Sequence, residues 1–167
     1  MNNLTGFRRL LAAAGVLATA AVVIASAAGA NGSAVVKVAP SNLGRVLVDA
    51  HGKTLYIWAH DKGSKSTCYG ACARYWPALI THGKPKALAG ANQKLVGTSR
   101  RSNGSLQVTY RGHPLYYFSG DTKAGQTSGA GLTDFGGVWS PVSGKGSAVR
   151  SAAGSGAGAG SGGYPTP

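Results

Sequence analysis

Two cysteines, Cys68 and Cys72, are the side chains with the clearest capacity for covalent chemistry, and three residues separate them. In an exported protein, an even pair this close favours a local disulfide that staples a loop. The alternative is a redox or metal-binding thiol pair. Thioredoxin-like motifs use C-x2-C, a zinc site needs further ligands, and a covalent haem needs histidine where Ala73 stands. We predict a structural disulfide and keep functional thiols as the alternative.

Histidines could add metal chemistry to these sulfurs. His60 stands next to Asp61, and the other histidines are His51, His82 and His113. Their spacings match no template for copper or zinc, so we predict that neither a metal ion nor another cofactor is bound. The alternative function is an extracytoplasmic redox or metal-handling protein, which would combine the thiol pair with His60 or His113.

The acidic residues give little support to hydrolytic catalysis. All four are aspartates, and they lie far apart in sequence: Asp49, Asp61, Asp121 and Asp134. Paired-carboxylate mechanisms need two acids held close together, although Asp61 and Asp121 could approach each other in the fold. The sequence has no G-x-S-x-G nucleophile elbow and no glycine-rich phosphate loop between a strand and a helix. We therefore predict no catalytic residues and no enzyme activity.

The pattern G-x-x-L-Y-x-[aromatic]-x-x-D occurs twice, over residues 52–61 and 112–121. Such self-similarity indicates a duplicated structural unit. Aromatic residues spaced by two are typical of a strand face in a core, although they could also line a pocket for a ring or a sugar. We expect each aspartate to hold the turn that follows it; the alternative is a pair of cation ligands. The motif residues are Tyr56, Trp58 and Asp61 in the first copy and Tyr116, Phe118 and Asp121 in the second.

Apolar alternation and turn residues predict how the chain positions these motifs. The expected strands cover residues 44–49, 54–59, 106–110 and 115–118, paired as one hairpin in each copy. A helical turn near Cys72 is the only helix expected, and residues 81–92 are expected to form a loop. The sequence therefore predicts an all-β fold, a small barrel or sandwich built from two pseudo-symmetric repeats.

The N-terminal segment, residues 1–30, has the three parts of a signal peptide. Arg8 and Arg9 give a short positive region, residues 10–24 form an uncharged apolar run, and residues 28–30 match an A-x-A cleavage site. The alternative is a retained N-terminal anchor. The arginine pair is a weak signal for twin-arginine export, because two arginines also serve an ordinary positive region, and the export route stays open.

The rest of the chain divides into three segments of different composition. We predict a linker over residues 31–39, a β domain over residues 40–142 and a disordered Gly/Ala/Ser-rich tail over residues 143–167. Within the domain, the first repeat is expected at about residues 43–80 and the second at about residues 103–142. We predict no transmembrane span in the mature chain.

The charge of the chain is strongly basic, with a formal net charge of +13. Without Arg8 and Arg9, 15 basic and 4 acidic residues remain, a net charge of 15 − 4 = +11. A basic exported protein is attracted to anionic wall polymers or lipid headgroups, although the charge could also serve solubility alone. Nucleic acid is not predicted as a partner, because the basic residues are scattered and match no nucleic-acid-binding motif.

The repeat, its place behind a signal peptide and the stretch Cys68-x3-Cys72-x3-Trp76-Pro77 resemble a known bacterial family. This is the secreted repeat of unknown function, also described as predicted lipoproteins with a Y-x-[FWY]-x-x-D motif. The resemblance covers about residues 43–142. It implies an extracytoplasmic protein, often anchored at the surface, and no agreed activity, cofactor or catalytic residue. This chain has no cysteine for lipid attachment at the cleavage site, which favours release.

The sequence thus predicts a secreted, non-catalytic module of the cell envelope or extracellular space. We expect it to bind a ligand or an anionic surface. Any specific function is expected where the two copies differ, at Cys68 to Cys72 in the first copy and at Arg100 and Arg101 before the second.

Overall fold

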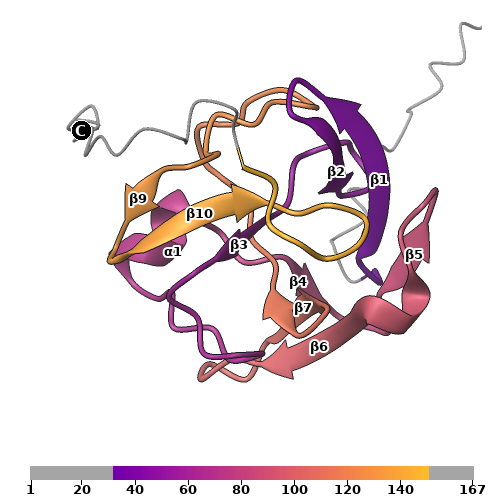
Figure 1. Ribbon diagram of the computed structural model, residues 1–167. Coiled ribbons are helices and arrows are strands. Elements are labelled where there is room, and N and C mark those ends of the chain that lie inside the picture. The colour runs from indigo at the N-terminus through magenta and orange to yellow at the C-terminus, as the bar shows by residue number, and fades with distance from the viewer. Residues whose placement is uncertain (1–31, 151–167) are drawn as a thin grey trace, which may run out of the picture.

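The computed structural model describes residues 32–150, which fold mainly into short strands (Figure 1). The predicted signal peptide over residues 1–30 and the chain from residue 151 onward lie outside the described residues. The all-β fold predicted from the sequence is confirmed. Its three small sheets pack around a common centre and do not close into one barrel.

Each sheet joins strands from different parts of the chain. The first sheet has the order β2 (Gly44–Val48), β1 (Val35–Ser41), β5 (Lys86–Leu88). The second has the order β3 (Tyr56–Trp58), β10 (Gly137–Pro141), β9 (Thr133–Asp134). The third has the order β4 (Ile80–Thr81), β7 (Leu106–Tyr110), β6 (Val96–Arg100), and β8 (His113–Pro114) also pairs with β7. A short helix, α1 (Ala71–Tyr75), follows Cys68, and a 3-10 turn, η1 (Gln93–Leu95), precedes β6.

Strand β1 corrects the predicted linker over residues 31–39. Val36 and Val38 are buried on either side of Lys37, so this segment has the alternation of a strand with one face in the core. It forms the middle of its sheet, antiparallel to β2 and parallel to β5. Strand β5 in turn lies within residues 81–92, where a loop was expected.

The two repeats are intertwined, because the segment that ends each copy pairs with the other copy. Strand β10, at the end of the second copy, pairs with β3 of the first, and β4, at the end of the first copy, pairs with β7 of the second. The backbone hydrogen bonds repeat this exchange. The Leu47 N–H donates to the Val142 carbonyl at 2.6 Å, and the Val108 N–H donates to the Leu79 carbonyl at 2.8 Å.

The copies meet where Tyr56 and Tyr116 face each other. Each backbone N–H donates to the carbonyl of the other residue, at 2.8 and 3.0 Å. Tyr116 also forms an isolated bridge with Ala78. The strand expected over residues 115–118 is therefore replaced by β8 and these single bridges, because Tyr116 pairs with a different segment on each side.

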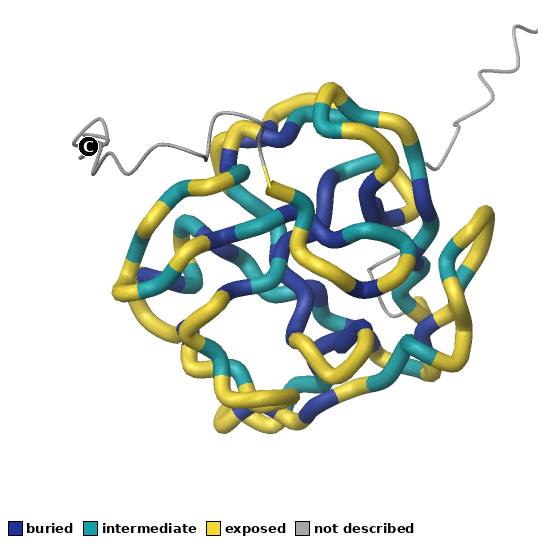
Figure 2. Tube along the Cα trace, viewed as in Figure 1, coloured by how far each residue is buried: buried dark blue, intermediate teal, exposed yellow. Residues whose placement is uncertain are grey.

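The core has an aliphatic part and an aromatic part. Figure 2 shows buried segments running through the centre of the molecule, with exposed loops around them. The aliphatic cluster lies among β1, β2, β7 and the segments that flank them. The aromatic cluster consists of Tyr56, Trp58, Cys68, Cys72, Trp76, Tyr116 and Trp139.

The chain keeps a defined structure beyond residue 142, which corrects the predicted start of the disordered tail. The Ser143 N–H donates to the Ser147 carbonyl at 2.9 Å, and the Tyr110 hydroxyl donates to the Gly144 carbonyl at 2.8 Å. Residues up to 150 therefore belong to the folded part, and the rest of the predicted tail lies outside the described residues.

Candidate functional site

The motif tyrosines and aspartates form two hydrogen bonds that cross between the repeats. The Tyr56 hydroxyl donates to Asp121 Oδ2 at 2.6 Å, and the Tyr116 hydroxyl donates to Asp61 Oδ2 at 2.7 Å. Each repeat supplies the donor of one bond and the acceptor of the other. Bonds of this length to a carboxylate are among the stronger hydrogen bonds in proteins. The duplicated motif thus fastens the copies to each other.

The second oxygen of each aspartate holds the loop that follows it. Asp61 Oδ1 accepts the Thr67 N–H at 2.8 Å, and Asp121 Oδ1 accepts the Ser128 N–H at 2.9 Å. The sequence suggested such a turn-holding role, but the contacts reach six and seven residues ahead, beyond the span of a tight turn. Both oxygens of both carboxylates are therefore engaged within the fold.

Burial shapes the ionisation of this network. Asp121 is only 1 % exposed, and Asp61 is half-buried. Burial raises the pKa of Asp61 above its usual range, against the opposing effect of hydrogen bonds from Tyr116 and Thr67. Burial also raises the pKa of Tyr56, reinforced by its bond to Asp121, and burial raises the pKa of Tyr116. Both tyrosines therefore stay protonated donors well above neutral pH.

The three tryptophans of the chain form one stacked column in the aromatic core. The ring of Trp139 lies between Trp58, at 5.0 Å, and Trp76, at 3.9 Å, with nearly parallel planes. Phe118 continues the column at 4.4 Å from Trp76, and His60 lies 4.9 Å from Trp58. Because the tryptophan rings are buried against each other, they fill the core.

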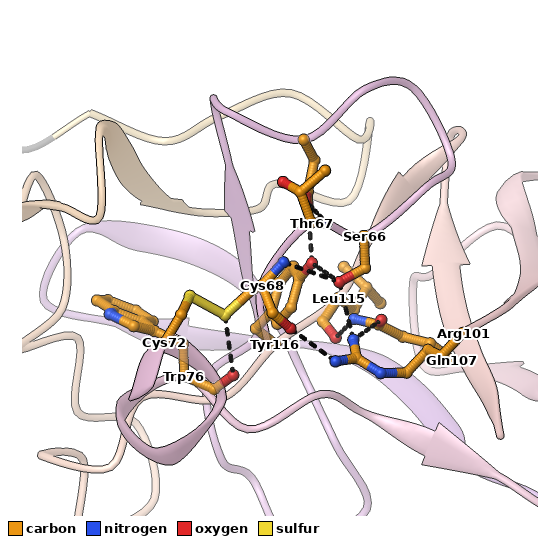
Figure 3. Close-up of a disulfide and its surroundings, with 10 residues drawn as sticks. Ser66, Thr67, Cys68, Cys72, Trp76, Arg101, Gln107, Leu115 and Tyr116 are labelled. Atoms are coloured by element: carbon orange, nitrogen blue, oxygen red, sulfur yellow. Dashed lines mark hydrogen bonds between the residues drawn. A yellow bond between two sulfur atoms is a disulfide. The ribbon is translucent and has the colours of Figure 1, made fainter. Parts of the chain in front are cut away.

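Cys68 and Cys72 form a disulfide, which confirms the prediction (Figure 3). The bridge spans the start of α1, with a Cα–Cα distance of 5.3 Å, and both residues are buried against Trp76. The thiol pair of the alternative function is therefore oxidised and shielded.

The buried side chain of Arg101 joins the disulfide loop to the second repeat. Its Nη2 donates to the Cys68 carbonyl at 2.6 Å, and its Nη1 donates to Gln107 at 2.6 Å and Ser66 at 2.8 Å (Figure 3). Ser66 Oγ lies 2.7 Å from the Tyr116 hydroxyl. The two features that differ between the copies are thus in contact, and the geometry gives Arg101 a structural role.

His60 and His113 are exposed. Within residues 32–150, no three His, Cys, Asp or Glu side chains gather closely enough to share a metal ion.

A pocket of about 540 Å³ opens beside the first motif. Trp58, Asp61, His113 and Arg150 are among the residues that line it, together with apolar side chains such as Val138.

A family model described as "secreted repeat of unknown function" matches the chain twice, over residues 37–80 and 97–143. The two matches cover more than half of the sequence and coincide with the two intertwined units. The chain belongs to this family. No curated protein and no solved structure matches the chain significantly.

The secreted repeats each begin six residues before the starts predicted from the sequence, at 37 rather than 43 and at 97 rather than 103. Most of these added residues belong to β1 and β6, which open the two units as hairpins with β2 and β7. The family description supports an extracellular location. Across the part of the chain that the structure describes, no helix is long and apolar enough to span a membrane.

The surface of this secreted repeat protein is cationic, because its carboxylates are withdrawn into the fold. Asp49 was not singled out by its sequence, yet it is buried and accepts the N–H groups of His51 and Lys53 and the Tyr117 hydroxyl. Of the described aspartates, none is exposed, and Asp134 is half-buried. The exposed charged side chains of the described region are Arg45, Lys62, Lys65, Arg74, Lys84, Lys86, Lys94, Arg100, Arg111, Lys123, Lys145 and Arg150.

Proposed function

We propose that this protein is a non-enzymatic module of the cell envelope or extracellular space that binds anionic surfaces. The observation that carries the proposal is the segregation of charge. Twelve lysine and arginine side chains are exposed in the described region, while all four aspartates are buried or half-buried. Every fully exposed charged side chain of the described region is therefore positive, and no exposed carboxylate there opposes the ionic attraction to a polyanion.

Within residues 32–150, the hydrogen bonds of Asp49, Asp61 and Asp121 come from backbone N–H groups and from tyrosine and threonine hydroxyls, and not from the exposed cations. The lysine and arginine heads remain available to phosphate or carboxylate groups of another molecule. Anionic wall polymers and anionic lipid headgroups share this chemistry, so both are candidate surfaces.

The test is binding of the purified protein to envelope fractions of the producing bacterium, before and after chemical removal of anionic polymers, and to vesicles with and without anionic lipid. A Lys62→Gln/Lys65→Gln variant removes two exposed charges, and Lys62→Arg/Lys65→Arg is the matched control. We expect binding to require an anionic component, to weaken in the glutamine variant and to persist in the arginine control. Binding that is unaffected by removal of the anionic component and by the glutamine substitutions would overturn the proposal.

The pocket beside Trp58 favours a second candidate function, the binding of a small amphipathic molecule. The pocket combines apolar side chains such as Ile57 and Val138 with the charged groups of Asp61 and Arg150, a mixture typical of ligand sites. Protein purified without harsh extraction would then carry a bound small molecule detectable by native mass spectrometry. An Ala148→Trp variant, which narrows the same pocket, should lose it. The absence of a bound molecule and of any ligand-dependent stabilisation would count against this function.

A further inference from the structure

The hairpin formed by β9 and β10 presents apolar side chains to solvent. Large exposed apolar residues are few in the described region: Tyr69, Leu88, Phe135 and Val138. Two of these lie on this one hairpin, Phe135 with 41 % of its surface exposed and Val138 with 43 %. Figure 1 shows the turn of the hairpin at the edge of the molecule, beside α1. The hairpin is therefore an accessible apolar projection.

Phe135 adopts a backbone conformation that its side chain disfavours. Its φ is 53° and that of Gly136 is 89°, so both central turn residues have positive φ. Two-residue hairpin turns of this kind favour asparagine or aspartate before glycine, and a bulky residue there is an outlier. The β7–β8 turn has the same pattern with Arg111 before Gly112, so the turn does not require an aromatic residue. Phe135 is thus both strained and partly exposed, which makes it a candidate for a contact outside the fold.

The turn lies beside α1, which carries a basic residue, and beside a histidine. Exposed Arg74 lies in α1, next to Tyr75, whose ring is 6.2 Å from that of Phe135. On the other side, the backbone of Gly136 lies against the ring of His60. The carboxylate of the hairpin, Asp134, is half-buried with its Oδ2 shielded from solvent. The apolar tip therefore packs against a helix that carries an exposed cation, Arg74.

We propose that the β9–β10 hairpin is a lipid-binding tip, in which Phe135 enters the interface of an anionic membrane while exposed cations such as Arg74 contact headgroup phosphates. This rests on the proposed function and selects one of its two candidate surfaces. A hydrated wall polymer offers no apolar phase for a phenylalanine side chain, whereas a bilayer interface does. Peripheral binding of this kind combines buried apolar area with attraction to anionic lipids.

The test compares the purified protein with a Phe135→Asn variant in flotation assays with vesicles of anionic and of zwitterionic lipid. Asparagine removes the aromatic ring and suits the positive φ, so the melting temperature should be unchanged or higher. We expect affinity for anionic vesicles to fall about fivefold. The control is Leu88→Asn, because Leu88 is 52 % exposed on β5, far from the hairpin, and its replacement should leave binding unchanged.

The outcomes separate the two proposals. A selective loss in Phe135→Asn, with a folded variant and an unaffected control, supports the lipid-binding tip. Equal vesicle binding by the variant overturns the tip and leaves anionic-surface binding intact. Binding to anionic polymers without binding to vesicles would also overturn the lipid-binding tip and leave anionic-surface binding intact. Failure to bind either surface overturns both proposals.

Discussion

Tyr56 of the first repeat donates its hydroxyl proton to Asp121 of the second across 2.6 Å, in the interior of the protein. The reverse contact, from Tyr116 to Asp61, completes the exchange. Neither repeat can satisfy its own tyrosine and aspartate, and the closing strands are exchanged in the same way. The duplicated motif is therefore best understood as the connection that makes two short units into one domain.

Removal of the Tyr56 hydroxyl should destabilise the domain. In Tyr56→Phe, Asp121 stays buried and loses its tyrosine donor, so we expect the free energy of unfolding to fall by about 2 kcal/mol. Urea denaturation measures the change. Tyr69→Phe is the control, since Tyr69 is partly exposed and should contribute less than about 0.5 kcal/mol. Equal stability of the two variants would refute the role of the crossed bond.

The stability of the domain should be sensitive even to a conservative replacement of Arg101. It is 8 % exposed and donates to three neutral acceptors from a planar head that lysine cannot reproduce. We expect Arg101→Lys to lower the free energy of unfolding by about 2–3 kcal/mol. The exposed neighbour provides the control, because Arg100→Lys should be nearly neutral. Thermal and urea unfolding that fail to distinguish these variants would show that the network is dispensable.

The disulfide should behave as a buried structural staple. Native protein is expected to show no reactive thiol, and two should appear after reduction in denaturant. Replacing both cysteines with serine should reduce the free energy of unfolding by about 2 kcal/mol, the value expected for so short a loop. A thiol reagent that labels the unreduced native protein would contradict this description.

Asp61 should give the domain a distinctive pH dependence. Burial raises its pKa in the folded state above the unfolded value. Its stabilising contribution is therefore complete below the unfolded pKa and is lost as pH rises through the folded pKa. We expect the wild type to gain stability relative to Asp61→Asn as pH falls from neutral into the acidic range. The midpoints of urea denaturation of both proteins at several pH values measure this difference. A loss of wild-type stability relative to Asp61→Asn on acidification would contradict the prediction.

The local elements were largely predictable from the sequence. Alternation identified β2 and β7, and the spacing of Tyr56 and Trp58 placed both side chains in the core. The cysteine spacing in an exported context indicated the disulfide. Each of these inferences depends on residues a few positions apart, where strand periodicity and loop length act directly.

The long-range relationships were not predictable. Strand β1 has clear alternation at Val36 and Val38, but its parallel partner β5 is a three-residue strand without a signal of its own. The bond between Tyr56 and Asp121 joins residues 65 positions apart. Periodicity determines which face a side chain occupies, and it does not determine which copy supplies the partner. The exchange between repeats follows from packing of the whole domain.

The affinity of the purified protein for anionic envelope material, measured over a series of salt concentrations, tests the central claim most directly. If exposed cations without neighbouring carboxylates make the contacts, binding should be tight at low salt. It should weaken at least tenfold between about 50 mM and 200 mM salt, with the protein folded throughout. Undetectable binding at low salt, or an affinity that does not change with salt, would contradict the proposal that this secreted repeat protein binds anionic surfaces.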